Sequence, residues 1–200
     1  HNHYDHLDLP SLHQLWKRDH PVMIVGLGVD TLLKEKGFTH TKALDWWQDL
    51  QLTKTTDVTF VPARHFSGRG LFDRMKTLWG GFVIQTPQDT IYFAGDTGYD
   101  KHFLKIKQRF GPLSLSFLPI GAYKPRWVMK DVHLNPKEAY QAHLDLNSHH
   151  SVGIHFGTFD NLTDEAIDAP QHELQKAINT HQMQTHPFVV PEFGQTIRLR

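Results

Sequence analysis

The first six residues of the chain carry four side chains that can bind a metal ion: His1, His3, Asp5 and His6. Imidazole and carboxylate groups suit zinc, iron and manganese, and such an ion needs three or more of them at about 2.0–2.2 Å. On an extended segment alternate side chains share a face, so His1 and His3 point together while Asp5 and His6 lie farther along. This spacing predicts two neighbouring metal ions.

A hexapeptide cannot surround a metal ion alone, so further ligands must come from other parts of the chain. The candidates are His65, Asp96 and His155, each of which follows a β-prone apolar run, at 58–62, 91–94 and 152–154. Functional side chains often gather where strands end. Two alternatives stay open: Asp96 serves the turn at 95–98, or the histidine-rich start is a tag remnant or a surface metal scavenger.

The composition narrows the function classes. Two hundred residues, of which 39% are hydrophobic, fit one globular domain with a substantial core. Lys plus Arg equal Asp plus Glu at 21 each, so no basic footprint for nucleic acid is expected. The chain has no cysteine, which excludes disulfides, thiolate metal sites and a cysteine nucleophile. Any metal site must therefore use nitrogen and oxygen ligands.

No apolar run approaches the ~20 residues that would span a bilayer, and no signal segment is visible at the start. We therefore expect a soluble or peripheral membrane protein with no transmembrane segment. The chain begins with His1, directly on its metal-binding motif, so we expect that upstream residues have been lost.

Periodicity and turn residues predict layered sheets flanked by helices, a mixed α/β (α+β) class. Helices are expected to start at Asp8-Leu9-Pro10 and to cover 29–36, 99–109, 135–145 and 169–180. Strands are expected in these ranges: 21–25, several short runs within 42–62, a hairpin of 77–85 with 90–94, then 113–119, 151–155, 188–190 and 196–199.

Four segments resemble the metallo-β-lactamase superfamily: HNHYDHLD, FAGDTGY, IGAYKPRW and HFGTF. Within it, the chain is similar to the N-acylphosphatidylethanolamine-hydrolysing phospholipase D family, as a bacterial-type relative. LDWW, TFVPARH, RFGP and VHLNPKEA also match in order, so the likeness covers nearly the whole chain. It implies the αββα sandwich fold in a single domain, residues 1–200, truncated at its N-terminus because the family's opening strands would precede His1.

The resemblance also implies the role of each ligand. One ion would be held by His1, His3 and His65, the second by Asp5, His6 and His155, and Asp96 would bridge both. The cofactors implied are two divalent metal ions, zinc or alternatively iron or manganese. Two such ions about 3.5–4 Å apart can share a water, lower its pKa and stabilise an in-line phosphoryl displacement.

The resemblance further predicts catalytic and substrate-binding residues. The catalytic pair is Asp5, as a metal ligand, and His133, which would protonate the leaving alkoxide or bind a phosphate oxygen. Four more residues are expected to meet the substrate, the cations at anionic headgroups and the indole at a lipid interface: Tyr4, Lys124, Arg126 and Trp127. Alternatives stay open here too, namely a surface histidine at 133, a packing tyrosine at 4 and a solvated loop at 123–127.

The expected activity is phospholipase D-type hydrolysis of N-acylphosphatidylethanolamine to N-acylethanolamine and phosphatidic acid. The partner is then a phospholipid or another phosphodiester, with a peripheral membrane contact. Alternatives are a lactone, a β-lactam or a nucleotide phosphodiester as substrate, or a non-catalytic metal-binding scaffold. After His65 the sequence Phe-Ser-Gly-Arg-Gly is less basic than in the animal phospholipases, so the adjoining pocket is expected to differ.

Overall fold

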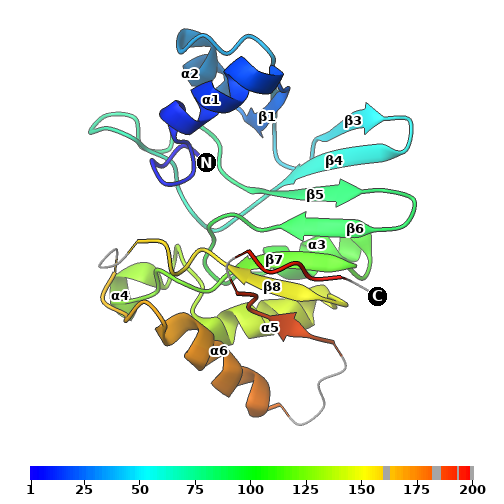
Figure 1. Cartoon of the computed structure of the whole chain (residues 1–200), viewed down its shortest axis with the longest axis vertical. Helices are drawn as coiled ribbons and strands as arrows, with labels where there is room; N and C mark the ends of the chain where they lie inside the picture. The colour runs from blue at the N-terminus through cyan, green and yellow to red at the C-terminus, as the bar shows by residue number, and fades with distance from the viewer. Residues whose placement is uncertain (160–162, 182–185, 193, 199–200) are drawn as a thin grey trace.

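A computed structural model describes residues 1–159, 163–181, 186–192 and 194–198. Its centre is a seven-stranded sheet in the order β3-β4-β5-β6-β7-β8-β9 (Figure 1). The strands are β3 (Asp49–Thr53), β4 (Thr56–Val61), β5 (Gly81–Gln85), β6 (Thr90–Phe93), β7 (Leu115–Pro119), β8 (Ser151–Ile154) and β9 (Phe188–Val189). Pairing is antiparallel from β3 to β6 and parallel from β6 to β9.

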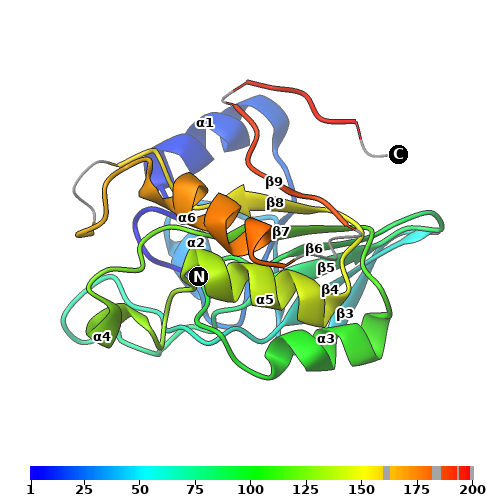
Figure 2. The ribbon, with the colours of Figure 1, turned by 90° about the horizontal axis from the view of Figure 1, so that it is seen from below.

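Three helices cover one face of this sheet: α3 (His102–Phe110), α5 (Pro136–Leu146) and α6 (Ala169–Asn179) (Figure 2). Between them and the strands lies the main core, in which Tyr92 and Leu118 of the sheet are fully buried with Phe103 of α3 and Tyr140 of α5. A short helix, α4 (Arg126–Met129), follows β7.

Residues 1–44 build a smaller unit from α1 (Leu9–Asp19), β1 (Met23–Gly26), α2 (Val29–Glu35) and β2 (Thr41–Leu44). The strands β1 and β2 form a separate parallel pair. A second hydrophobic cluster around Leu7, Val29, Leu33 and Phe38 holds the helices of this unit together. Leu7 directly follows the metal-binding hexapeptide, so this cluster anchors the segment that carries four candidate ligands.

Local sequence signals explain where two helices begin. At α5 the Asn135 side chain accepts a hydrogen bond from the backbone of Glu138, whose side chain accepts one from Asn135, and Pro136 occupies the first turn. At α1 the Asp8 carboxylate accepts a hydrogen bond of 2.9 Å from the Ser11 backbone N–H.

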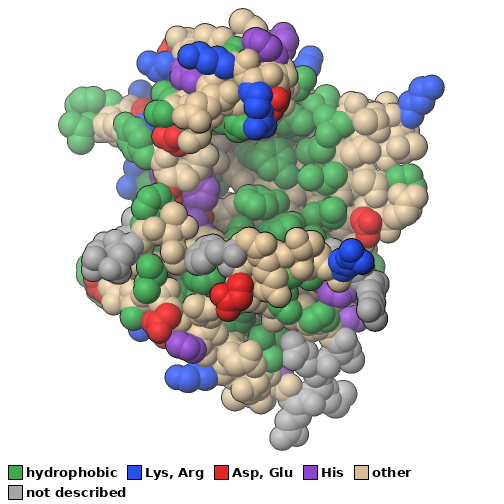
Figure 3. Space-filling model, viewed as in Figure 1, with side chains coloured by type: hydrophobic (Ala, Val, Ile, Leu, Met, Phe, Trp, Pro, Cys, Tyr) green, Lys and Arg blue, Asp and Glu red, His purple; other side chains and the backbone are tan. Residues whose placement is uncertain are grey.

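The other face of the large sheet has no helix against it in the described part of the chain. Strand register places Phe82, Phe93 and Phe117 side by side on this face, and Phe93 is 43% exposed. Figure 3 shows hydrophobic side chains gathered over β4, β5 and β6 beside a hollow. The sheet therefore presents an apolar face that opens toward the N-terminal unit.

The predicted elements agree with the structure for nearly every helix and strand, with shifted ends. The helix expected at 99–109 begins at His102, and the strand expected at 77–85 begins at Gly81. Two expectations are wrong: residues 123–127 are not all loop, because α4 begins at Arg126, and residues 196–198 form no strand. Leu199, the last residue of that expected strand, lies outside the described residues. No helix of the described chain has the length and apolar character to cross a membrane.

A buried histidine in α5 gives the fold a pH dependence. His143 shares a hydrogen bond of 2.8 Å with the Ser151 hydroxyl, and burial lowers its pKa from 6.5 to about 4. Between these two values the unfolded chain binds more protons at this site than the folded chain, so stability falls as the pH drops from 6.5 to 4. The loss attributable to this one group is no more than about 3 kcal/mol.

We expect the His143→Gln variant to lose less stability than the wild type over that pH window. Urea unfolding at several pH values under identical metal conditions measures the difference in slope. The exposed His172→Gln variant is the control and should follow the wild type. Parallel pH profiles for wild type and His143→Gln would contradict this origin of the acid sensitivity.

Candidate metal centre

The N-terminal hexapeptide is a tight turn rather than an extended segment. The backbone N–H groups of His6 and Leu7 both donate to the carbonyl oxygen of His3, at 3.2 and 2.9 Å. His1 and His3 converge as the sequence predicted, with 2.7 Å between His1 Nε2 and His3 Nδ1. The expectation of an extended segment was wrong, because these hydrogen bonds form a turn, but Asp5 and His6 still belong to a second group of ligand atoms.

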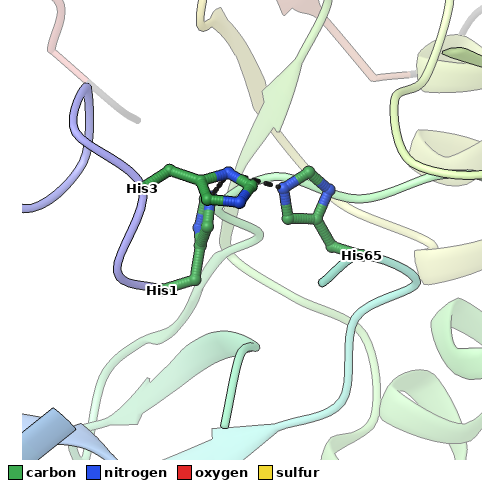
Figure 4. Close-up of side chains that lie close together, drawn as sticks. All are labelled: His1, His3 and His65. Carbon is green, nitrogen blue, oxygen red and sulfur yellow. Dashed lines mark hydrogen bonds between the residues drawn. The ribbon is translucent and has the colours of Figure 1, made fainter. Parts of the chain in front are cut away.

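His65, from the loop after β4, completes a first group with His1 and His3. Figure 4 shows the two N-terminal imidazoles pointing toward His65. His65 Nε2 lies 3.4 Å from His3 Nδ1, and the three ligand atoms all lie within 4.8 Å of one another. Two nitrogens bound to one tetrahedral zinc ion at 2.0–2.1 Å would be about 3.3 Å apart, so the spacing suits a shared ion.

A second group contains Asp5, His6, Asp96 and His155. His155 Nε2 lies 3.4 Å from Asp5 Oδ2 and 3.2 Å from Asp96 Oδ1. His6 Nε2 lies 3.1 Å from Asp96 Oδ2. The structure thus brings together two imidazoles and two carboxylates from three separate parts of the sequence.

Asp96 connects the two groups. Its Oδ2 lies 3.8 Å from His1 Nε2 and 3.7 Å from His65 Nε2, as well as close to His6 of the second group. Asp96 is only 3% exposed, and its Oδ1 is buried without a hydrogen-bond partner among the described residues. A buried carboxylate oxygen with no donor is costly unless something else satisfies it, and a cation between the two groups would do so.

The pKa shifts of two ligands, His65 and Asp96, also suit a metal ion. Burial lowers the pKa of His65 to about 3, so its ring is neutral near pH 7. The Val132 carbonyl oxygen, 2.9 Å from Nδ1, accepts a hydrogen bond from the Nδ1–H group, which leaves the Nε2 lone pair facing the site. Burial opposes ionisation of Asp96, but the hydrogen bond to His6 and nearby imidazoles hold its pKa well below the usual range.

His155 reaches the site through an unusual backbone conformation. It directly follows β8 with φ of +59°, a left-handed value that side chains other than glycine adopt at a cost. A Cβ at Gly121 would lie 2.2 Å from the His155 carbonyl oxygen. Only glycine therefore allows the chain after β7 to pass close enough for His155 to turn inward.

His133 lies against the same centre. Its ring centroid is 5.2 Å from that of His65 and 5.6 Å from that of His155. Its Nδ1 is buried without a hydrogen-bond partner among the described residues, and burial lowers its pKa. A ligand atom of His133 also forms a group with those of His65 and Asp96. The alternative of a solvated surface histidine is wrong.

Three of the four expected substrate-binding residues lie at the surface or form contacts within the chain. Tyr4 is exposed and donates a hydrogen bond of 3.2 Å to the Arg69 carbonyl oxygen. Trp127 is 87% exposed on α4. Lys124 forms an ion pair of 3.5 Å with Glu173. Their contact with a substrate stays a prediction.

Arg126 is already engaged within the chain. It donates a hydrogen bond of 2.8 Å to the His133 carbonyl oxygen and forms a close ion pair with Glu138. These contacts tie the residues before α5 to the helix start. They hold the backbone of His133 in place. Contact of Arg126 with an anionic headgroup stays a prediction.

Sequence reasoning missed Arg69, which holds the ligand turn in place. Its Nη1 donates to the carbonyl oxygens of Asn2 at 2.9 Å and Leu7 at 2.8 Å, at the two ends of the turn. Its guanidinium also lies 3.9 Å from the ring centroid of Tyr4. The neighbouring Gly68 N–H donates to the buried Asn2 side chain at 2.7 Å. Only the departure of residues 66–70 from the animal pattern pointed to this loop.

A cavity of about 280 Å³ opens beside the second group. Its polar lining includes Asp5, His155 and Glu165. Its apolar walls come from the chain after β8 and from α6, and include Phe156, Phe159, Ile167 and Pro170. Small-molecule sites usually measure about 300–1,000 Å³, so this cavity holds a small group or part of a larger molecule.

The chain is similar to known proteins over most of its length. Residues 1–156 match the family model described as "Beta-lactamase superfamily domain". The chain is 40% identical over 181 residues to the mitochondrial N-acyl-phosphatidylethanolamine-hydrolyzing phospholipase D of Saccharomyces cerevisiae, covering 88% of this chain and 38% of that protein. It is 33% identical over 206 residues to the corresponding phospholipase D 1 of Caenorhabditis elegans, covering 98% and 58%. The chain thus spans less than two thirds of the length of these relatives.

A solved structure with the same fold is that of Igni18, a metallo hydrolase from Ignicoccus hospitalis. The TM-score is 0.72 at 20% sequence identity, over 98% of this chain and 76% of that one. At this identity the likeness concerns the fold alone.

We expect the Arg69→Ala variant to bind zinc about 10- to 100-fold more weakly than the wild type, as is typical when a residue that orients metal ligands is lost. Competition with a chromogenic chelator measures the affinity. Lys76→Ala, an exposed cation of the same loop, is the control and should bind zinc as the wild type does. Equal zinc affinities for both variants would refute the role of Arg69, and Arg69→Lys should fall between Arg69→Ala and the wild type.

Proposed function

Since the chain belongs to the beta-lactamase superfamily, we propose that it is a metal-dependent hydrolase that cleaves a phosphodiester at a two-metal centre. The family resemblance and the mixed α/β fold class expected from the sequence are confirmed. The observation that carries the proposal is the position of Asp96, whose two carboxylate oxygens lie within 3.8 Å of ligand atoms in both groups.

The residues present fit two divalent ions. The donor set is imidazole nitrogen and carboxylate oxygen, which suits zinc, with iron and manganese as alternatives. Once bound, two such ions would supply Lewis-acid charge and lower the pKa of a shared water. One ion would be held by His1, His3 and His65, the other by Asp5, His6 and His155, with Asp96 bridging them.

The protein's own residues would orient and enclose this chemistry. The Val132 carbonyl holds the His65 ring so that one nitrogen always faces the site. The side chains of His1, His65 and Asp96 are each no more than 2% exposed, whereas those of Asp5 and His6 are 31% and 21% exposed. Water and a substrate can therefore reach the centre from the side of Asp5 and His6.

His133 is placed to handle a proton or a phosphate oxygen. It lies next to His65 and His155, and its buried Nδ1 has no partner within the described chain. Cleavage of a phosphodiester leaves an alkoxide that needs a proton. We assign this task, or a hydrogen bond to the phosphate, to His133.

We further propose that the substrate is an N-acylphosphatidylethanolamine, cleaved to N-acylethanolamine and phosphatidic acid. The support is the identity of 40% and 33% to two phospholipases named for this lipid. The cavity beside Asp5 and His155 has apolar walls but only about 280 Å³, so it would take a headgroup or part of one acyl chain. The remainder of a lipid would lie outside it, and the hollow beside the apolar side chains of the sheet in Figure 3 is a candidate place for an acyl chain.

We expect the metal-loaded protein to release labelled N-acylethanolamine from this lipid in mixed micelles. Asp96→Asn should lose metal and reduce the rate by more than about a hundredfold, because it removes a ligand rather than an outer contact. Asp100→Asn, an exposed neighbour, is the control. Protein with two bound metal ions per chain that cleaves lactones or β-lactams and leaves every phosphodiester intact would contradict the proposed substrate.

We expect His133→Gln to keep both metal ions and lower kcat by about 10²- to 10⁴-fold, the usual contribution of a positioned acid or base. Metal analysis and steady-state kinetics on the same preparation test this, with the exposed His172→Gln as control. Loss of one metal ion from His133→Gln would instead make His133 a ligand.

A further inference from the structure

The loop between β4 and β5 carries an exposed apolar tip, residues 70–76. Leu71 is 92% exposed and Phe72 is 85% exposed, and Met75 is also exposed. Isolated exposed apolar residues are common on protein surfaces, but large ones that are adjacent and almost fully solvated usually mark an interaction site.

The charge around this tip is basic. Arg74 and Lys76 are exposed on it. The carboxylate of Asp73 is bound within the loop, because it accepts hydrogen bonds from the backbone N–H groups of Arg69 at 3.0 Å and Gly70 at 2.8 Å. Exposed Leu and Phe beside Arg and Lys form the combination that inserts into the headgroup region of an anionic bilayer.

The tip is firmly connected to the metal centre. Phe66, at the start of the same loop, packs its ring 4.6 Å from that of His3 and 5.0 Å from that of His65. The loop and α4, which carries the exposed Trp127, lie along the same edge of the molecule, on the left in Figures 1 and 2. The guanidinium of Arg74 in the tip lies 4.5 Å from the Phe66 ring centroid, so Phe66 links the tip to the ligand rings.

We propose that residues 70–76 dock the protein onto an anionic phospholipid bilayer. Leu71 and Phe72 enter the interface, and Arg74 and Lys76 contact lipid phosphates. The purpose of this surface rests on the proposed function, because docking would bring a phospholipid headgroup to the metals. Binding of the tip to a bilayer does not itself require that function, because the exposure and charge of the tip do not depend on which bond the metal centre cleaves.

Sedimentation with sucrose-loaded vesicles tests the proposal, using phosphatidylcholine alone and phosphatidylcholine mixed with phosphatidylserine. The double variant Leu71→Ser/Phe72→Ser should bind both kinds of vesicle at least about tenfold more weakly than the wild type. Leu104→Ser is the matched apolar control, because Leu104 is 51% exposed on α3. It should bind as the wild type does.

The charge pair is tested separately. Arg74→Gln/Lys76→Gln should lose about fivefold per charge on vesicles with phosphatidylserine and little on phosphatidylcholine alone. Lys105→Gln/Lys107→Gln, two exposed charges on α3, is the control with the same change in net charge. Equal losses for both pairs would mean that net charge rather than the tip binds the vesicle, which would overturn the proposal.

Two further outcomes would also overturn it. Leu71→Ser/Phe72→Ser could bind vesicles as tightly as the wild type, or could convert a wild-type dimer to monomer with vesicle binding unchanged, which would make the tip an interface between copies of this chain.

Hydrolysis of soluble bis(p-nitrophenyl) phosphate should be the same in wild type and this variant. Vesicle binding without lipid cleavage would refute only the proposed function, and lipid cleavage in micelles without vesicle binding would refute only the docking surface.

Discussion

A buried carboxylate governs the architecture of this protein. Asp96 is almost fully enclosed, and an ionised carboxylate in such a place is unfavourable unless opposite charge or hydrogen-bond donors surround it. The imidazoles of His1, His6, His65 and His155 lie within 3.8 Å of its oxygens. These imidazoles satisfy it only in part, because Oδ1 is buried without a hydrogen-bond partner among the described residues. The site is therefore organised around a negative charge for which cations are the natural complement.

The sheet explains how segments so far apart in sequence reach one carboxylate. Register pairs Val61 with Gly81 and Phe82 with Phe93, so the ends of β4 and β6 lie at the same edge. The parallel pairing of β6, β7 and β8 puts the end of β8 there as well. His65, Asp96 and His155 follow these three strands. All three ligands lie close together because the three strands end at the same edge of the sheet.

The strands, the helix starts and the types of metal ligand could be predicted from the sequence. The strands before His65, Asp96 and His155 are short apolar runs, and the capping residues Asn135 and Glu138 are local signals. Such features depend on neighbours a few residues away, so a single sequence reveals them. The ligand types followed from chemistry, and their grouping followed from the resemblance.

Contacts between distant residues were not accessible in the same way. Arg69 bonds to Asn2 and Leu7 across more than 60 residues, and nothing in the local sequence distinguishes it from a solvated arginine. The turn at His3 was also missed, because its hydrogen bonds compete with an extended conformation that the alternating histidines suit equally well. Helix α4 has a single turn, which is too short for a periodic pattern to appear.

The loop after β4 links the outer surface to the ligands. Its backbone and Arg69 bind the N-terminal turn, and its Phe66 packs against two ligand rings. The turn is also held by the contacts of Asp5 with His155 and of His6 with Asp96, and Leu7 after it enters the hydrophobic cluster of the N-terminal unit. Order in the loop therefore favours order in the turn, and by thermodynamic linkage any ion that orders the turn also stabilises the loop. A surface that restrains residues 70–76 would act on the same equilibrium, because the loop and the ligand turn share their hydrogen bonds.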